Sequence, residues 1–118
     1  MIQSFRDLQI WQKSMQLAVA TYQLTKGFPR EELYGLTSQI RRSAVSVPSN
    51  IAEGQGRLNL GEFRQFLGIA RGSNCELQTQ LEIASALGFG KPELLHDAQG
   101  LSQEVSKMIY AFIESLKS

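Results

Sequence analysis

Apolar residues recur at helical spacing along most of the chain, and short stretches containing glycine and proline divide this pattern into four segments. Ser4 with Asp7 three residues later resembles a capping box, and Asn59 with Glu62 repeats that signal. Pro92 suits the first turn of a further helix. We therefore predict four helices, spanning about residues 5–26, 30–53, 60–87 and 92–117.

The segments that separate these predicted helices are short, which favours antiparallel packing of successive helices. No alternation of apolar and polar residues is long enough to predict a strand. We therefore predict an all-α protein with an antiparallel up-down-up-down four-helix bundle. A length of 118 residues indicates one domain, residues 1–118.

The second predicted helix has two contrasting sides. Its apolar stripe consists of Leu33, Leu36, Ile40, Ala44, Val47 and Ile51. Pro48 lies within this helix, so we expect a bend there. The other side carries hydrogen-bonding groups, and counting outward from the turn near Gly56 places Arg42 near Arg71. The candidates for one polar network are Gln39, Arg42, Ser46, Asn50, Glu53, Arg71, Ser73 and Glu76.

Two interpretations of this network remain open at the level of sequence. The arginines could receive a phosphate or an acidic peptide. Alternatively, the network could fix the register of helices or the geometry of subunits, which is the interpretation that we favour.

The first predicted helix has apolar residues on two sides. We assign its core face to Phe5, Leu8, Trp11, Met15, Ala18, Val19 and Tyr22. Ile10, Leu17 and Leu24 recur every seven residues on the side opposite that face. They could be scattered surface residues, but the heptad spacing favours a seam for self-association.

The net charge of +1 gives no overall basic field of the kind that marks many nucleic-acid-binding proteins. The charge is unevenly distributed, however, because residues 41–71 have a balance of +3 and residues 72–118 a balance of −3. The basic middle could bind an anionic partner or complement acidic helices of the same protein. The nucleic-acid-binding candidates are Arg41, Arg42, Arg57, Arg64 and Arg71.

The sequence contains little that suggests catalysis. It has one histidine, His96, and one cysteine, Cys75, without the spacing of a metal site or a nucleophile and its base. We therefore expect a protein that is not an enzyme, with no metal, cofactor or small-molecule substrate. The lone cysteine, with neither a secretory signal nor a long apolar run, indicates the cytoplasm and no membrane association.

The chain also resembles a known family between Phe5 and Phe89. The likeness is carried by three runs, FRDLQIWQKS, FPREELYGLTSQIRRSAVSVPSNIAEGQGR and EFRQFLGIARGSNCELQTQLEIA. They resemble the four-helix bundle proteins encoded in intervening sequences of bacterial 23S ribosomal RNA genes, which are called S23-like. The last predicted helix matches this family only in its apolar pattern.

This resemblance implies a left-handed antiparallel bundle and a ring-shaped homo-oligomer, expected to be a pentamer. It also implies kinship with accessory bundle proteins of diversity-generating retroelements, which associate with nucleic acid and a reverse transcriptase. It implies no known reaction and no catalytic residues. Our leading hypothesis is a non-catalytic oligomer that associates with structured RNA or other nucleic acid. The alternative is a protein-interaction scaffold with no nucleic-acid role.

Overall fold

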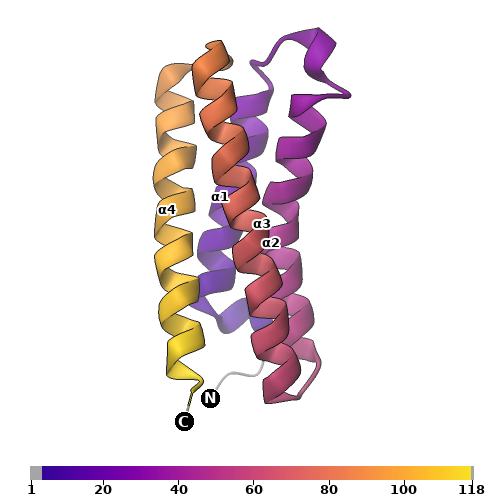
Figure 1. Ribbon diagram of the computed structural model, residues 1–118, viewed down its shortest axis with the longest axis vertical. Coiled ribbons are helices and arrows are strands. Elements are labelled where there is room, and N and C mark those ends of the chain that lie inside the picture. The colour runs from indigo at the N-terminus through magenta and orange to yellow at the C-terminus, as the bar shows by residue number, and fades with distance from the viewer. Residues whose placement is uncertain (1–3, 118) are drawn as a thin grey trace.

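The computed structural model describes residues 4–117, which form four long helices and two short 3-10 helices (Figure 1). The elements are η1 (Phe5–Asp7), α1 (Gln9–Thr25), η2 (Arg30–Glu32), α2 (Leu36–Gly56), α3 (Leu60–Leu87) and α4 (Pro92–Ser115). Each long helix packs against the next, and α1 also packs against α4, which closes the bundle. The predicted antiparallel four-helix bundle is confirmed. Within residues 4–117, no helix has the length and apolarity needed to cross a membrane.

The ends of the helices follow local capping chemistry. The side chain of Asn59 accepts a hydrogen bond from the Glu62 N–H at the start of α3, as predicted. The start predicted for the second helix was too early, because residues 30–32 form η2 and α2 begins only after Gly35. Glu32 Oε1 accepts a hydrogen bond from the N–H of Leu36 at 3.1 Å, and so caps α2.

Pro48 lies inside α2, and the helix continues on both sides of it as far as Gly56. The side chain of Pro48 is buried, next to the fully buried Val47. The apolar stripe predicted for this helix forms part of the core at its last four positions, whereas Leu33 lies before the helix and is 45% exposed.

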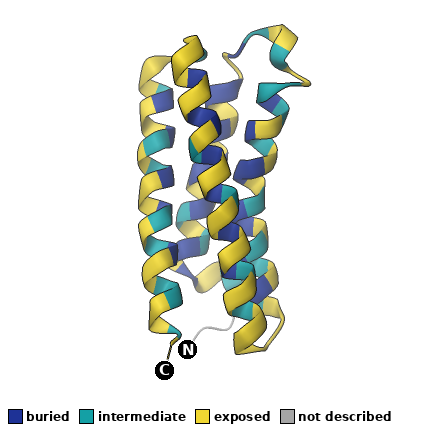
Figure 2. Ribbon diagram, in the orientation of Figure 1, coloured by how far each residue is buried: buried dark blue, intermediate teal, exposed yellow. Residues whose placement is uncertain are grey.

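The core runs along the bundle axis, with buried residues on the inner side of every long helix (Figure 2). It also includes polar side chains whose hydrogen bonds are made within the protein. Three of these residues lie on α1, namely Ser14, Thr21 and Thr25. Their hydroxyls donate to the carbonyls of Ile10, Leu17 and Thr21, at 2.6, 2.7 and 2.9 Å. Because these groups are satisfied locally, the inner face of α1 can be partly polar.

The seam predicted on α1 is wrong. Ile10, Leu17 and Leu24 are 4%, 0% and 0% exposed, so they belong to the core of the single chain. Met15, Val19 and Tyr22 were assigned to the core, but they are 38%, 53% and 41% exposed. The prediction counted only apolar side chains, and therefore missed the serine and threonines that complete the true inner face.

Gly54 is the glycine at which α2 and α3 approach each other most tightly. A Cβ atom at this position would lie 2.6 Å from Cβ of Phe66 and 3.1 Å from Cδ1 of Phe63. A side chain at residue 54 would therefore force the two helices apart next to their connecting turn. This close approach brings Phe66 beside the end of α2, where its ring centroid lies 5.0 Å from the guanidinium of Arg57.

Candidate nucleic-acid interface

Part of the predicted polar network forms between α2 and α3. The hydroxyls of Ser46 and Ser73 are 2.8 Å apart, and Asn50 Nδ2 donates to the carbonyl and hydroxyl oxygens of Ser46 at 2.8 and 2.9 Å. Glu76 joins this flank through Ser43, whose hydroxyl donates to Glu76 Oε1 at 3.3 Å. Because two helices share these bonds, the contacts favour one register of α2 against α3.

The other predicted members of the network lie elsewhere. Gln39 and Arg42 are exposed, and Glu53 pairs with Arg57 instead of with a serine or asparagine. Ser43 was missed, although it lies at helical spacing between Ile40 and Val47 in the apolar stripe.

The prediction that Arg42 and Arg71 face each other is wrong. The guanidinium of Arg71 lies 5.0 Å from the ring centroid of Tyr110 on α4. Asn74, one turn further along α3, bonds to Ser102 of α4: its Nδ2 donates to the Ser102 carbonyl at 2.9 Å, and the Ser102 hydroxyl donates to its Oδ1 at 2.7 Å. Residues 71 and 74 therefore lie on the flank of α3 that faces α4.

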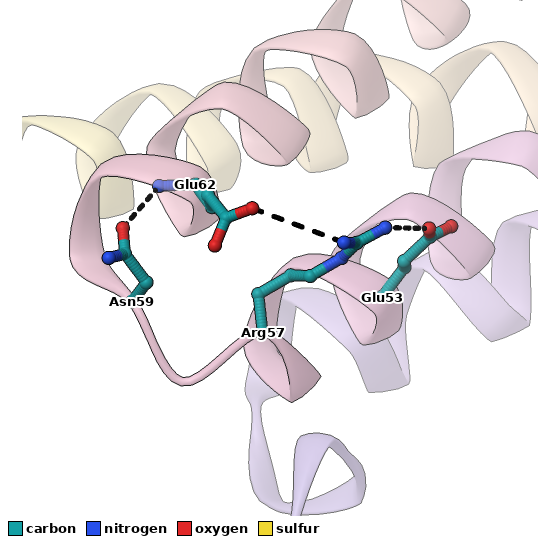
Figure 3. Close-up of polar contacts among 4 residues, drawn as sticks. All are labelled: Glu53, Arg57, Asn59 and Glu62. Carbon is teal, nitrogen blue, oxygen red and sulfur yellow. Dashed lines mark hydrogen bonds and ion pairs between the residues drawn. The ribbon is translucent and has the colours of Figure 1, made fainter.

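Arg57 lies in the turn between α2 and α3, where two carboxylates flank it (Figure 3). Its Nη2 is 2.9 Å from Glu53 Oε2, and its Nη1 is 4.0 Å from Glu62 Oε1. The guanidinium also lies 5.0 Å from the ring centroid of Phe66. These partners leave Arg57 the least suited of the five arginine candidates to bind a phosphate.

Arg41 lies near the opposite end of α2 and is held in place by α1. Its Nε donates to Thr25 Oγ1 at 2.8 Å, and its guanidinium lies 4.7 Å from the ring centroid of Tyr22. The hydrogen bond uses one of the five N–H donors of the side chain, and its partner is neutral. The position of the guanidinium is therefore fixed while its charge is not neutralised.

A surface hollow of about 450 Å³ opens beside Arg41. We call it the Arg41 hollow, and it is lined by Tyr22, Leu33, Tyr34, Thr37, Ser38, Arg41, Arg42 and Val45. Both arginines thus line one hollow together with hydroxyl-bearing and aromatic side chains, and the guanidinium of Arg41 is placed there by its contact with Tyr22. Tyr34 is 94% exposed, so most of its ring is open to solvent. Sequence reasoning missed Tyr34, Thr37 and Ser38, because only the fold brings them beside the arginines and α1.

The remaining arginines do not join this hollow. Arg71 lies against α4 and Arg64 is exposed near the start of α3. Within the described residues, Arg57 is the only arginine with a carboxylate oxygen within 4.0 Å. The five candidates are therefore spread over the surface, and the structure groups only Arg41 and Arg42.

The histidine and the cysteine considered for catalysis lie on different helices. Cys75 lies exposed on α3 and His96 lies exposed on α4. Over residues 4–117, no group of three His, Cys, Asp or Glu side chains is placed to hold a metal ion.

One ion pair perturbs the pKa values of its members, and it lies outside the hollow. Lys117 Nζ is 2.7 Å from Glu114 Oε2 at the end of α4. This hydrogen bond and the attraction between the charges lower the pKa of Glu114 and raise the pKa of Lys117. The pair is solvent-exposed, where ion pairs contribute little to stability.

Comparison with known proteins identifies the family. Residues 6–111 match the family model described as 23S rRNA-intervening sequence protein. The fold is similar to that of a Bacteroides thetaiotaomicron protein of unknown function from the S23 ribosomal protein family. The two have a TM-score of 0.81 and 25% sequence identity, over 89% of this chain and 95% of that one. No curated protein matches. The family match covers most of the sequence, and the chain therefore belongs to the 23S rRNA-intervening sequence protein family.

Proposed function

We propose that this chain is a non-catalytic, self-associating bundle protein of the cytoplasm that binds structured RNA. The proposal depends on one observation, the pairing of Arg41 with Arg42 at a single hollow. Neither has a carboxylate within 4.0 Å among residues 4–117. A phosphate that enters the hollow therefore meets arginine side chains without a counter-charge, and it can form charge-assisted hydrogen bonds with them.

The family supports an RNA partner, because its name ties its members to 23S rRNA genes. The net charge of +1 indicates that the electrostatic attraction is local to the hollow. We therefore expect few phosphate contacts, with a salt dependence that is clear but smaller than that of strongly basic proteins.

We propose no catalytic role for Cys75 or His96. They are exposed on different helices, and neither lines the Arg41 hollow.

RNA binding can be tested directly on the purified protein. Its affinity for a labelled RNA hairpin is measured by fluorescence anisotropy at about 50 mM and about 200 mM salt. Two phosphate contacts predict a loss of about tenfold over this range. The ratio of absorbance at 260 and 280 nm, before and after nuclease treatment, shows whether RNA co-purifies. An affinity that does not change with salt, or no binding at the lower salt concentration, would overturn the proposal.

Self-association is supported by the outer side of α3. Ile69 and Ile83 are 46% and 45% exposed there. Apart from the backbone of its own helix, a Cβ atom at Gly68 or Gly72 would meet no atom of residues 4–117 within 4 Å. Each glycine costs the helix about 1 kcal/mol relative to alanine. Close approach of a second copy would offset that cost, and the family resemblance sets the expected assembly as a pentamer.

A charge placed on this side of α3 tests the assembly. Ile69→Glu should reduce the mass measured by light scattering, while Ile69→Ala serves as the control for the loss of side-chain volume. The residue is exposed, so the bundle itself should remain folded by circular dichroism. An unchanged mass for Ile69→Glu would contradict a role for the outer side of α3 in self-association.

The second candidate function is a protein-interaction scaffold without a nucleic-acid role. It is favoured by two apolar side chains on the outer side of α1, Met15 and Val19, which the single chain leaves exposed. Under this function Arg42→Gln should leave RNA retention at the level of the unmodified protein. A loss of retention in that variant supports the RNA-binding function instead.

A further inference from the structure

We infer that the Arg41 hollow receives one unpaired nucleotide of a structured RNA, with its phosphate at the two arginines and its base against Tyr34. This inference rests on the proposed function and names the feature of RNA that is recognised. The hollow of about 450 Å³ falls within the range of about 300–1,000 Å³ typical of sites for small ligands. Because the hollow is open to solvent, an unpaired nucleotide can reach its lining residues, whereas the bases of a duplex stay stacked within the double helix.

The arginine side of the hollow suits a phosphate. Arg41 is held by its hydrogen bond to Thr25 and by the ring of Tyr22, so little conformational freedom is lost when it binds. Thr25 is itself oriented, because its hydroxyl donates to the carbonyl of Thr21 at 2.9 Å. The planar Nη groups of a fixed guanidinium match two oxygens of one phosphate.

The aromatic side of the hollow suits a base. Tyr34 is 94% exposed, and it precedes Gly35, which directly precedes α2. Proteins that read unpaired RNA stack its bases on aromatic rings of this kind, beside a positively charged surface. Ser38 also lines the hollow and is partly exposed, and its hydroxyl can bond to the sugar or to the edge of a base.

The acidic residues closest in sequence to Tyr34 do not place a negative charge in the hollow. Glu32 uses its Oε1 to cap the N-terminus of α2, and neither Glu31 nor Glu32 lines the hollow. The hollow is therefore lined by two cations and no anion.

The test uses two RNA duplexes that differ only in one bulged uridine. The unmodified protein should bind the bulged duplex about tenfold more tightly than the fully paired one. Tyr34→Ala should remove this preference and leave the affinity for the paired duplex within about twofold, while Tyr34→Phe should keep it. Tyr110→Ala, which removes a half-exposed tyrosine on α4, is the matched control and should also keep the preference.

The outcomes separate this inference from the proposed function. If the unmodified protein binds both duplexes equally, or if Tyr34→Ala keeps the preference, the inference is overturned while RNA binding stands. If the protein binds neither duplex at low salt, both are overturned. Uridine monophosphate should compete only weakly with the bulged duplex. If the free nucleotide binds more tightly than the RNA, the inference that the hollow receives a nucleotide of an RNA strand is overturned.

Discussion

Two arginines near opposite ends of α2 each place the guanidinium over an aromatic ring, but their electrostatic surroundings differ. Arg41 lies 4.7 Å from the ring centroid of Tyr22, and Arg57 lies 5.0 Å from that of Phe66. Arg57 is also flanked by Glu53 and Glu62, whereas Arg41 bonds to a neutral threonine. The ring helps to orient each guanidinium, and the presence or absence of carboxylates decides whether its charge is free to act on a partner.

The largest effect should come from placing a carboxylate beside the arginines near the N-terminal end of α2, as Glu53 lies beside Arg57 at the C-terminal end. Ser38 lies four residues before Arg42, as Glu53 lies four residues before Arg57. Ser38→Glu should therefore place a carboxylate in the Arg41 hollow and weaken RNA binding by about 30-fold, through the lost phosphate site and direct repulsion. Fluorescence anisotropy measures this change.

Ser38→Gln is the control, since it has nearly the same size as the glutamate variant without its charge. It should bind RNA within about threefold of the unmodified protein. Equal losses in the two variants would mean that bulk in the hollow, and not the missing counter-charge, determines binding.

A smaller effect on RNA affinity should follow from removing the carboxylates beside Arg57, at the C-terminal end of α2. Glu53→Gln combined with Glu62→Gln removes both carboxylates near Arg57 and leaves its contact with Phe66 in place. RNA affinity should rise about threefold, because one more cation becomes available to phosphates. The same changes at two glutamates away from this turn, Glu82 and Glu93, control for the altered net charge. An equal rise in both pairs would show that only the total charge matters.

The smallest effect should come from releasing Arg41 from α1. Thr25→Val removes the acceptor of its Nε hydrogen bond, and should weaken RNA binding about twofold while lowering the free energy of unfolding by about 1 kcal/mol. Thr21→Val is the matched control, because the Thr21 hydroxyl donates to Leu17 and is buried on the same helix. It should lower stability, measured by urea denaturation, and leave the RNA affinity unchanged.

The sequence was sufficient to predict the four helices and their antiparallel order, because apolar spacing and capping residues act locally. Asn59 and its bond to the Glu62 N–H illustrate this. It also predicted that Ser46, Asn50 and Ser73 would form a network, since they occupy one flank of each of two adjacent helices.

Predictions from the sequence were wrong where a residue contacts a helix distant in the sequence, or where polar side chains lie on the buried face of a helix. Leu17 was placed outside the core, because the hydroxyls of Ser14 and Thr21 made the inner face of α1 look polar. Arg71 was paired with α2, although the orientation of α3 turns it toward Tyr110. The Arg41 hollow combines α1, α2 and the segment between them, so no local pattern could predict it.

The central claim is that the two ends of α2 differ in the availability of their arginine charge. It is tested most directly by the salt dependence of RNA binding for Arg42→Gln and Arg57→Gln, measured side by side with the unmodified protein. The logarithmic slope should fall by about 1 for Arg42→Gln and stay the same for Arg57→Gln. Equal slopes in the two variants, or a larger change for Arg57→Gln, would contradict the account.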